Sequence, residues 1–158
     1  MSGKGQMYKK SNQYAKDKKL GEKYENLLLE HFNKNEYKDA PLKKFKYQYS
    51  WYDYRNDTDC NELKTRRIFY NSYPDLMVGA NKMRQAEQKK HGLKYRFFFC
   101  LRDGTYYWDF TPNTDKETYY HYGVGGRKDR GCVEECKVAY IYTKHLKKYC
   151  DLNCNEDC

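Results

Sequence analysis

Two carboxylates and a lysine lie close together in the first half of the chain, between Asp53 and Lys64. In "CNELKTRR", Glu62 and Lys64 are separated by one residue, so on a β-strand they project from the same face. The preceding "RNDTD" has the composition of a turn. If that turn centres on Asp57 and Thr58, Asp53 lies directly opposite Glu62. The ordinary alternative is a solvated ion pair worth about 0.5 kcal/mol.

Asp53 also continues an apolar face. The segment "FKYQYSWYDY" alternates, and its aromatic residues on one face are Phe45, Tyr47, Tyr49 and Trp51, with Asp53 next. A carboxylate in that position is partly desolvated and needs a cation to stay ionised. Mg²⁺ accepts one or two carboxylates, keeps several waters and bridges to phosphate. The pattern therefore predicts a Mg²⁺ or Mn²⁺ site on Asp53 and Glu62.

The charge balance favours a polyanionic partner. The 158 residues contain 31 Lys and Arg against 22 Asp and Glu, a formal net charge of +9. We expect a nucleic acid, bound through its phosphates. The N-terminal segment lacks the apolar core of a secretory signal, and no run approaches 18 apolar residues. We therefore expect no membrane span and an intracellular location, with packaging in a virion as an alternative; a homodimer stays open.

Periodicity predicts one α/β domain with a mixed central sheet flanked by helices. Residues 1–19 are polar and lysine-rich, which predicts a flexible basic arm, and helical spacing begins at Leu20 and continues to about Asn33. Two antiparallel strands follow, over "FKYQYSWYDY" and "CNELKTRRIFY", and then a helix from about Leu76 to His91, closed by Gly92. "KYRFFFCL" predicts a buried strand, and Asp103-Gly104 a hairpin turn into "TYYWDF".

The C-terminal region is expected to add a strand, "KVAYIY", and a short helix near "KHLKKYC". Its cysteines are separated by three residues, at Cys132 and Cys136 and again at Cys150, Cys154 and Cys158. These spacings lack the two-residue knuckle typical of zinc fingers, although four of the thiols could serve as ligands. We expect an acidic tail over 151–158 that holds no stoichiometric zinc and is dispensable for folding.

The chain resembles the PD-(D/E)xK nuclease superfamily, whose members include restriction enzymes, Holliday-junction resolvases and phage-type exonucleases. "YDY" with Asp53 and "ELK" with Glu62 and Lys64 carry the resemblance, together with "GEKYE" in the helix before them. It covers roughly residues 20 to 110 and implies a restriction-endonuclease-like α-β-β-α-β core within a domain over 20–150. Asp53 follows Tyr52 instead of Pro, which leaves Asp57 and Asp59 as substitutes.

The resemblance implies a role for each matching residue. Asp53 and Glu62 would hold the metal, which would activate a water and offset phosphate charge, and Lys64 would orient that water. Glu25 would be the accessory carboxylate, with Glu22 a weaker candidate, although Glu25 could equally be solvated. The family often places a Lys or Gln on the following helix, where Lys82 and Gln85 fit one turn apart; an ordinary solvated helix face is the alternative.

Further cationic residues are candidates for nucleic-acid contacts. Arg66 and Arg67 alternate in direction, so at most one can face the site, and Arg66 is the candidate. In "GGRKDRG", Arg127 and Arg130 accompany backbone N–H groups that could bind phosphate, unless this is simply a hairpin tip. The expected function is Mg²⁺-dependent phosphodiester hydrolysis, most simply in DNA. The alternative is a catalytically silent nuclease-fold protein that binds nucleic acid or serves as a structural component of a virion.

Overall fold

The computed structural model describes residues 2–44, 52–88, 92–110, 116–125 and 137–155, except for the side chains of 2–11, 14 and 116. Its helices are α1 (Ser2–Lys34), α2 (Ala80–Glu87) and α3 (Lys116–Tyr119), with a 3-10 helix η3 (Thr143–His145). Its strands are β1 (Lys43–Lys44), β2 (Tyr54–Arg55), β3 (Asp59–Thr65), β4 (Asp75–Gly79), β5 (Lys94–Leu101), β6 (Gly104–Phe110), β7 (Tyr120–Val124), β8 (Lys137–Tyr142) and β9 (Lys147–Cys150). None of the helices in these ranges is long and apolar enough to cross a membrane.

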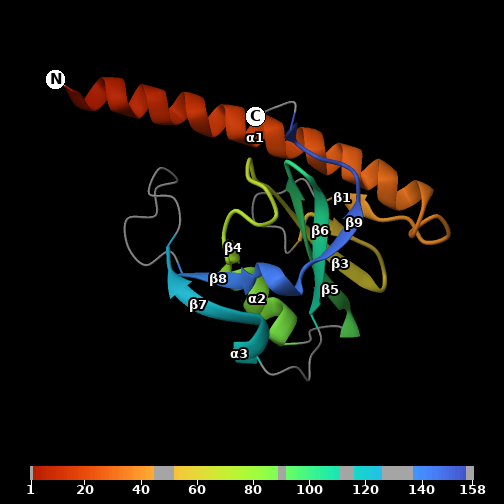
Figure 1. Ribbon diagram of the computed structural model, residues 1–158. Coiled ribbons are helices and arrows are strands. Elements are labelled where there is room, and N and C mark those ends of the chain that lie inside the picture. The colour runs from red at the N-terminus through yellow and green to blue at the C-terminus, as the bar shows by residue number, and fades with distance from the viewer. Residues whose placement is uncertain (1, 45–51, 89–91, 111–115, 126–136, 156–158) are drawn as a thin grey trace.

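The strands form two sheets. The larger has the order β1-β2-β3-β5-β6-β9, in which only the β3–β5 pair is parallel, and the smaller is the antiparallel β4-β8-β7. Helix α1 lies along one face of the large sheet, and α2 with the small sheet lies on the other (Figure 1). The expected α/β class, with a mixed central sheet flanked by helices, is confirmed.

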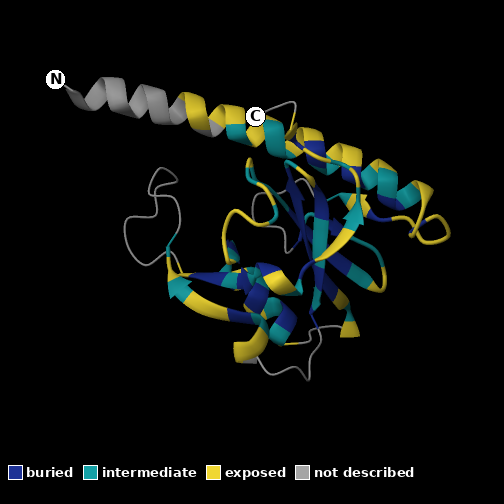
Figure 2. Cartoon of the chain, in the orientation of Figure 1, coloured by how far each residue is buried: buried dark blue, intermediate teal, exposed yellow. Residues whose placement is uncertain are grey.

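Strand β5 occupies the centre because its sequence is apolar on both faces. Its residues alternate between two clusters: Phe97 and Phe99 pack toward α2 and the small sheet, while Phe98 and Cys100 pack toward α1. All four are fully buried, and the buried residues gather on β5 and its neighbours (Figure 2). Such two-sided burial requires a continuous apolar run in place of alternation.

Helix α1 begins at Ser2, so the expected flexible arm over residues 1–19 is helical where the structure describes it. Its packed half follows the predicted spacing, with Tyr24, Leu28 and Phe32 buried against the large sheet. Once this half has formed, each further residue adds one hydrogen bond without a new nucleation cost, and the Lys and Gln residues of the first half are good helix formers. Helical structure therefore extends beyond the apolar stripe.

Two expected helices are wrong in part. The segment Asp75–Gly79 is strand β4, paired with β8, and α2 is correspondingly shorter. Leu76 and Val78 are buried and their neighbours are partly exposed, which is the two-residue period of a strand. Met83 and Ala86 follow at helical spacing, so the sequence alone does not mark where the strand ends and the helix begins. Near the C-terminus, "KKYC" forms strand β9 on the edge of the large sheet in place of a helix.

The acidic tail is also packed, contrary to expectation, as far as the structure describes it. Cys154 is completely buried, its N–H donates to the carbonyl of Leu101 (3.0 Å), and its thiol lies 3.3 Å from the carbonyl of Arg66. Thr105 donates its hydroxyl hydrogen to the carbonyl of Leu152 (2.7 Å). Residues 151–155 are therefore part of the folded body, because they satisfy backbone groups at the end of β5.

Candidate metal and nuclease site

The hairpin of β2 and β3 has the register predicted from its turn. Tyr54 pairs with Asn61 and Arg55 with Cys60, so Asp53, one residue before β2, lies opposite Glu62. Asn56 fixes the turn, since its side-chain oxygen accepts the N–H groups of Thr58 (2.9 Å) and Asp59 (2.7 Å). The predicted strand over residues 45–51 lies outside the described residues.

The chain bends at Asp53, and this bend separates two tyrosines that strand alternation would put on one face. Tyr52 packs in the cluster beside α2, whereas Tyr54 packs beneath α1. Between them, the Asp53 carboxylate accepts the backbone N–H of Leu63 at 2.8 Å. Asp53 is thereby fixed against β3, between a residue that packs in the α2 layer and one that packs in the α1 layer.

Asp53 is in an unfavourable environment for a negative charge. Burial of its carboxyl group, and then the neighbouring Glu62 and Glu25 carboxylates, raise its pKa well above the ordinary value, against the opposing effects of Lys64 and the Leu63 N–H. Part of the residue is still exposed, so the desolvation is local to the carboxyl group. An added cation would relieve both the desolvation and the repulsion.

Glu62 is buried, and its two oxygens face different lysines. Oε1 lies 3.6 Å from Nζ of Lys64 on the same strand, and Oε2 lies 3.6 Å from Nζ of Lys82 on α2. Oε2 accepts no hydrogen bond within the described part of the chain. A buried carboxylate oxygen with only long ion-pair contacts retains the capacity to bind a metal.

Lys82 is positioned by a residue that the sequence did not single out. The Tyr52 hydroxyl donates to the backbone carbonyl of Lys82 (2.7 Å), and Nζ of Lys82 lies 5.4 Å from the centre of the Tyr52 ring. Burial and the Glu62 charge raise the pKa of Tyr52, so this hydroxyl keeps its proton and remains a donor.

Glu25 reaches the site from α1. Its carboxylate lies 3.0 Å from Nζ of Lys44, and its backbone carbonyl accepts the Tyr54 hydroxyl (2.7 Å). Lys44 and Tyr54 are therefore two further residues that sequence reasoning missed. The contact with Asp53 is electrostatic, since Glu25 contributes to the raised pKa of that residue.

The remaining candidates are more dispersed. Gln85 lies one turn after Lys82 and has a buried side-chain oxygen without a hydrogen-bond donor among the described residues. Arg66, directly after β3, donates to the carbonyl of the preceding residue, Thr65 (3.1 Å). Arg127 and Arg130 lie outside the described residues.

The substitutes considered for Asp53 are used elsewhere. Asp59 accepts the Tyr37 hydroxyl (2.5 Å) on the α1 side of the sheet, and Asp57 is exposed at the turn. Glu22 is exposed on α1. The register and the burial therefore favour Asp53 and Glu62 as the carboxylate pair.

Two carboxylates are sufficient for Mg²⁺, which completes its coordination with water and substrate. Within the described ranges, no three His, Cys, Asp or Glu side chains lie close enough together to form an all-protein metal site. Oε2 of Glu62, which accepts no hydrogen bond among the described residues, and the repelled Asp53 carboxyl group fit a hard cation bound by oxygen ligands. Zinc sites, in contrast, usually take four nitrogen or sulfur ligands.

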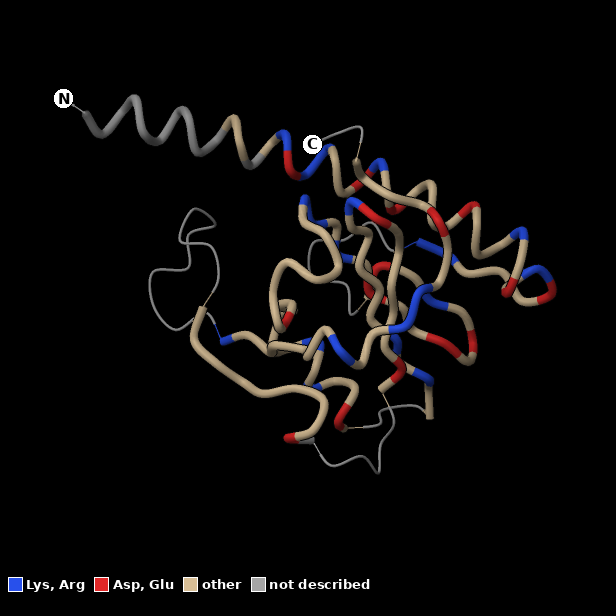
Figure 3. The backbone as a smooth tube through the Cα atoms, in the orientation of Figure 1, with Lys and Arg blue, Asp and Glu red and all other residues tan. Residues whose placement is uncertain are grey.

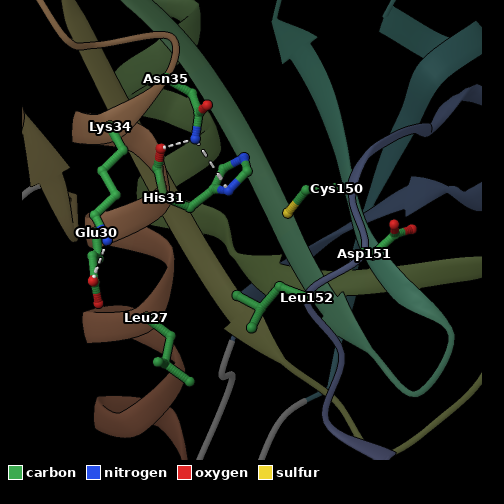
Figure 4. Close-up of a pocket in the computed structure, with 8 residues that line it drawn as sticks. All are labelled: Leu27, Glu30, His31, Lys34, Asn35, Cys150, Asp151 and Leu152. Atoms are coloured by element: carbon green, nitrogen blue, oxygen red, sulfur yellow. Dashed lines mark hydrogen bonds and ion pairs between the residues drawn. The ribbon is translucent and has the colours of Figure 1, made fainter.

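A separate pocket of about 510 Å³ lies between α1 and the C-terminal segment (Figure 4). It is lined by Leu27, Glu30, His31, Lys34, Asn35, Cys150, Asp151 and Leu152, none of which is a candidate residue. Glu30 pairs with Lys34 (2.7 Å), so its charge is already compensated at the surface. This pocket and the candidate carboxylate pair are thus in different places.

Comparison with protein families agrees with this geometry. A family model described as "Phage putative PDDEXK endonuclease" matches residues 8–148, which include every candidate residue. No curated protein and no solved structure matches the chain. Because the family match spans most of the sequence, the chain belongs to this phage PD-(D/E)xK endonuclease family.

Proposed function

We propose that the protein is a metal-dependent endonuclease that hydrolyses phosphodiester bonds in DNA. The observation that supports this most directly is the placement of Asp53 opposite Glu62, with Lys64 and Lys82 on the two oxygens of Glu62. Membership of the endonuclease family and the net charge of +9 agree with a nucleic-acid substrate.

In this proposal, Asp53 and Glu62 hold Mg²⁺ or Mn²⁺. When bound, such a cation lowers the pKa of water and neutralises the charge that develops on the phosphate. The Leu63 N–H fixes one oxygen of Asp53, so the carboxylate does not have to be ordered when the metal arrives. Binding also removes the repulsion that Glu25 and Glu62 exert on Asp53.

Lys64 is the residue best placed to act on the substrate. Its side chain is 27 % exposed, whereas the Glu62 side chain beside it is 5 % exposed, so Lys64 reaches solvent from a buried carboxylate. Its ammonium group can orient the attacking water and stabilise a phosphate oxygen. Lys82 is held more tightly by Tyr52 and is assigned to positioning Glu62.

Glu25 is assigned as the accessory carboxylate on the other side of Asp53. Its ion pair with Lys44 compensates its charge beside the second carboxylate. A water or a second cation bound by the Glu25 carboxylate would face Asp53 from α1. The side-chain oxygen of Gln85 is buried and has no hydrogen-bond donor among the described residues. Gln85 is proposed to bind a water, or to contact the nucleic acid.

A silent nucleic-acid-binding protein is the second candidate, favoured by one observation: both oxygens of Glu62 already face ammonium groups, so this carboxylate is compensated without metal. Incubation of metal-free protein with supercoiled plasmid, over a range of Mg²⁺ and Mn²⁺ concentrations, distinguishes the two. We expect metal-dependent nicking that Glu62→Gln abolishes. DNA binding without cleavage at any metal concentration would support the silent protein instead.

A further inference from the structure

The first half of α1, which we define as residues 2–19 and call the basic arm, differs from the rest of the helix. It contains six lysines and one acid: Lys4, Lys9, Lys10, Lys16, Lys18 and Lys19 against Asp17. It extends past the two sheets, toward the N-terminus, while the second half of α1 lies along the large sheet (Figure 1). The basic arm is therefore a cationic rod that projects from the body.

On a helix, the few apolar residues of the basic arm are interrupted by Lys4 and Lys18, so its sequence gives no broad apolar stripe with which to pack on the protein or enter a membrane. Among the α1 side chains that the structure describes, the buried ones are Tyr24, Leu28 and Phe32 in the second half, with Leu20 partly buried at the boundary. A helix that binds a membrane surface requires a broad apolar face opposite its cations. In the basic arm the lysines occur without such a face, which favours a partner that is charged throughout.

One ion pair fixes where the basic arm leaves the body. The Asp17 carboxylate lies 3.2 Å from the guanidinium group of Arg67, and its side chain is only 15 % exposed. Gln13, one turn earlier, also donates to Asp17 (2.9 Å). The charge of Asp17, the one acid in the arm, is thus compensated by Arg67 of the body. Arg67 follows Lys64 by three positions in the sequence. Figure 3 shows where the charged residues lie along the backbone.

The spacing along α1 connects the basic arm to the candidate site. Lys18 precedes Glu25 by seven residues, which is two helical turns, so both residues lie on the same side of the helix about 10 Å apart. Lys18 is exposed, as are Lys16 and Lys19. Lys18 therefore places a cation of the arm on the side of α1 that carries the accessory carboxylate.

From these observations we infer that the basic arm binds the phosphate backbone of duplex DNA next to the bond that is cleaved. The inference rests on the proposed function, because it takes DNA as the substrate. Residues 2–16 span about 22 Å of helix, comparable to six or seven base pairs at about 3.4 Å each. Lysines bind phosphates, which carry no sequence information, so binding is expected to be independent of sequence.

The test is the salt dependence of duplex binding in EDTA, measured by fluorescence anisotropy with a 30-base-pair probe. The variant Lys4→Gln/Lys9→Gln/Lys10→Gln/Lys16→Gln removes four arm charges. If each contacts a phosphate, the slope of log K against log salt falls in magnitude by up to about 3.6, and affinity at physiological salt falls at least about tenfold. Replacing the same four lysines with Arg keeps the positive charges, so that variant is expected to bind like the wild type.

A matched control removes four exposed lysines from the body: Lys38→Gln/Lys94→Gln/Lys144→Gln/Lys147→Gln. Equal losses in the two Gln variants would overturn the inference, since only overall charge would then matter. Arm-dependent binding to phosphatidylserine vesicles as tight as binding to the duplex would also overturn it. The binding assay requires no cleavage, so the two hypotheses can fail separately. If the protein nicks plasmid DNA but its binding does not depend on the arm, only the inference about the arm is rejected. If binding depends on the arm but no nicking occurs, only the proposed nuclease activity is rejected.

Discussion

Nζ of Lys82 on helix α2 lies 3.6 Å from Oε2 of Glu62 on strand β3. This contact joins the layer of α2 to the central sheet at the buried carboxylate that we propose as a metal ligand. Tyr52 supports it from the same layer by accepting the ammonium group over its ring and donating to the Lys82 carbonyl. The site therefore depends on packing between elements that are separate in the sequence.

Removing either carboxylate should abolish cleavage. We expect Asp53→Asn and Glu62→Gln each to lower the rate of plasmid nicking by about 10²- to 10⁴-fold, because metal-assisted charge stabilisation is worth several kcal/mol. Asn at position 53 keeps an acceptor for the Leu63 N–H, so the fold is retained. Asp57→Asn, at the exposed turn, is the control. Wild-type nicking by both site variants would refute the assignment.

The two lysines on Glu62 should affect chemistry and metal binding in opposite directions. Lys64→Met is expected to lose cleavage and yet bind Mn²⁺ at least as tightly as the wild type in calorimetry, because an ammonium group competes with a cation for the carboxylate. Lys82→Met should likewise retain Mn²⁺ binding. Loss of Mn²⁺ binding in Lys64→Met, with an unchanged circular dichroism spectrum, contradicts the role given to this residue.

The repulsion at Asp53 predicts a change in stability without metal. Since burial and two carboxylates raise the pKa of Asp53, its ionised form destabilises the folded state as pH rises through that pKa. Asp53→Asn should therefore raise the melting temperature of metal-free protein at neutral pH by about 2–4 °C, corresponding to about 1 kcal/mol.

The same variant should lose the response to metal. At a Mg²⁺ concentration about 100 times its dissociation constant, the wild type is expected to gain about 2.7 kcal/mol, whereas Asp53→Asn gains none. Differential scanning fluorimetry with and without Mg²⁺ measures both effects. Equal Mg²⁺ stabilisation of the two proteins would place the ion elsewhere.

The buried guanidinium group of Arg96 should be essential for stability. Arg96 is 3 % exposed, lies 2.8 Å from Glu36, and contacts the rings of Tyr37, Phe98, Tyr107 and Tyr149 at 5.0 to 5.7 Å. Because Glu36 is itself 39 % exposed, removing the guanidinium group leaves no buried charge, and the expected cost is that of hydrogen bonds to a charged group, about 1.5–3 kcal/mol. Urea unfolding of Arg96→Met should show this loss in the free energy of unfolding, and Arg102→Met, at a partly exposed position, is the control. A loss below about 1 kcal/mol would show that the pair contributes little.

Truncation tests the packed C-terminus. Removing residues 152–158 leaves Thr105 without its acceptor and exposes the space filled by Cys154, so we expect a melting temperature lower by about 5 °C or more. Removing only residues 156–158 should have little effect. An unchanged melting temperature in the longer truncation would support a dispensable tail.

The local part of this architecture follows from the sequence because its signals are short-range. The turn "RNDTD" sets the register that brings Asp53 opposite Glu62, since a two-strand hairpin has one pairing once its turn is fixed. The apolar run of β5 specifies burial on both faces, and the stripe from Tyr24 to Phe32 specifies how α1 packs. In each case the period of the side chains along one element contains the information.

Only the tertiary structure decided which elements contact one another. Leu76 and Val78 form a strand because β8 offers them hydrogen-bond partners, although their spacing merges with that of the following helix. The bend at Asp53 sends Tyr52 and Tyr54 into different layers, and only that division lets Tyr52 position Lys82 while Tyr54 contacts Glu25. Periodicity records which side of one element is apolar, whereas the partner that covers that side is selected by packing across the whole chain.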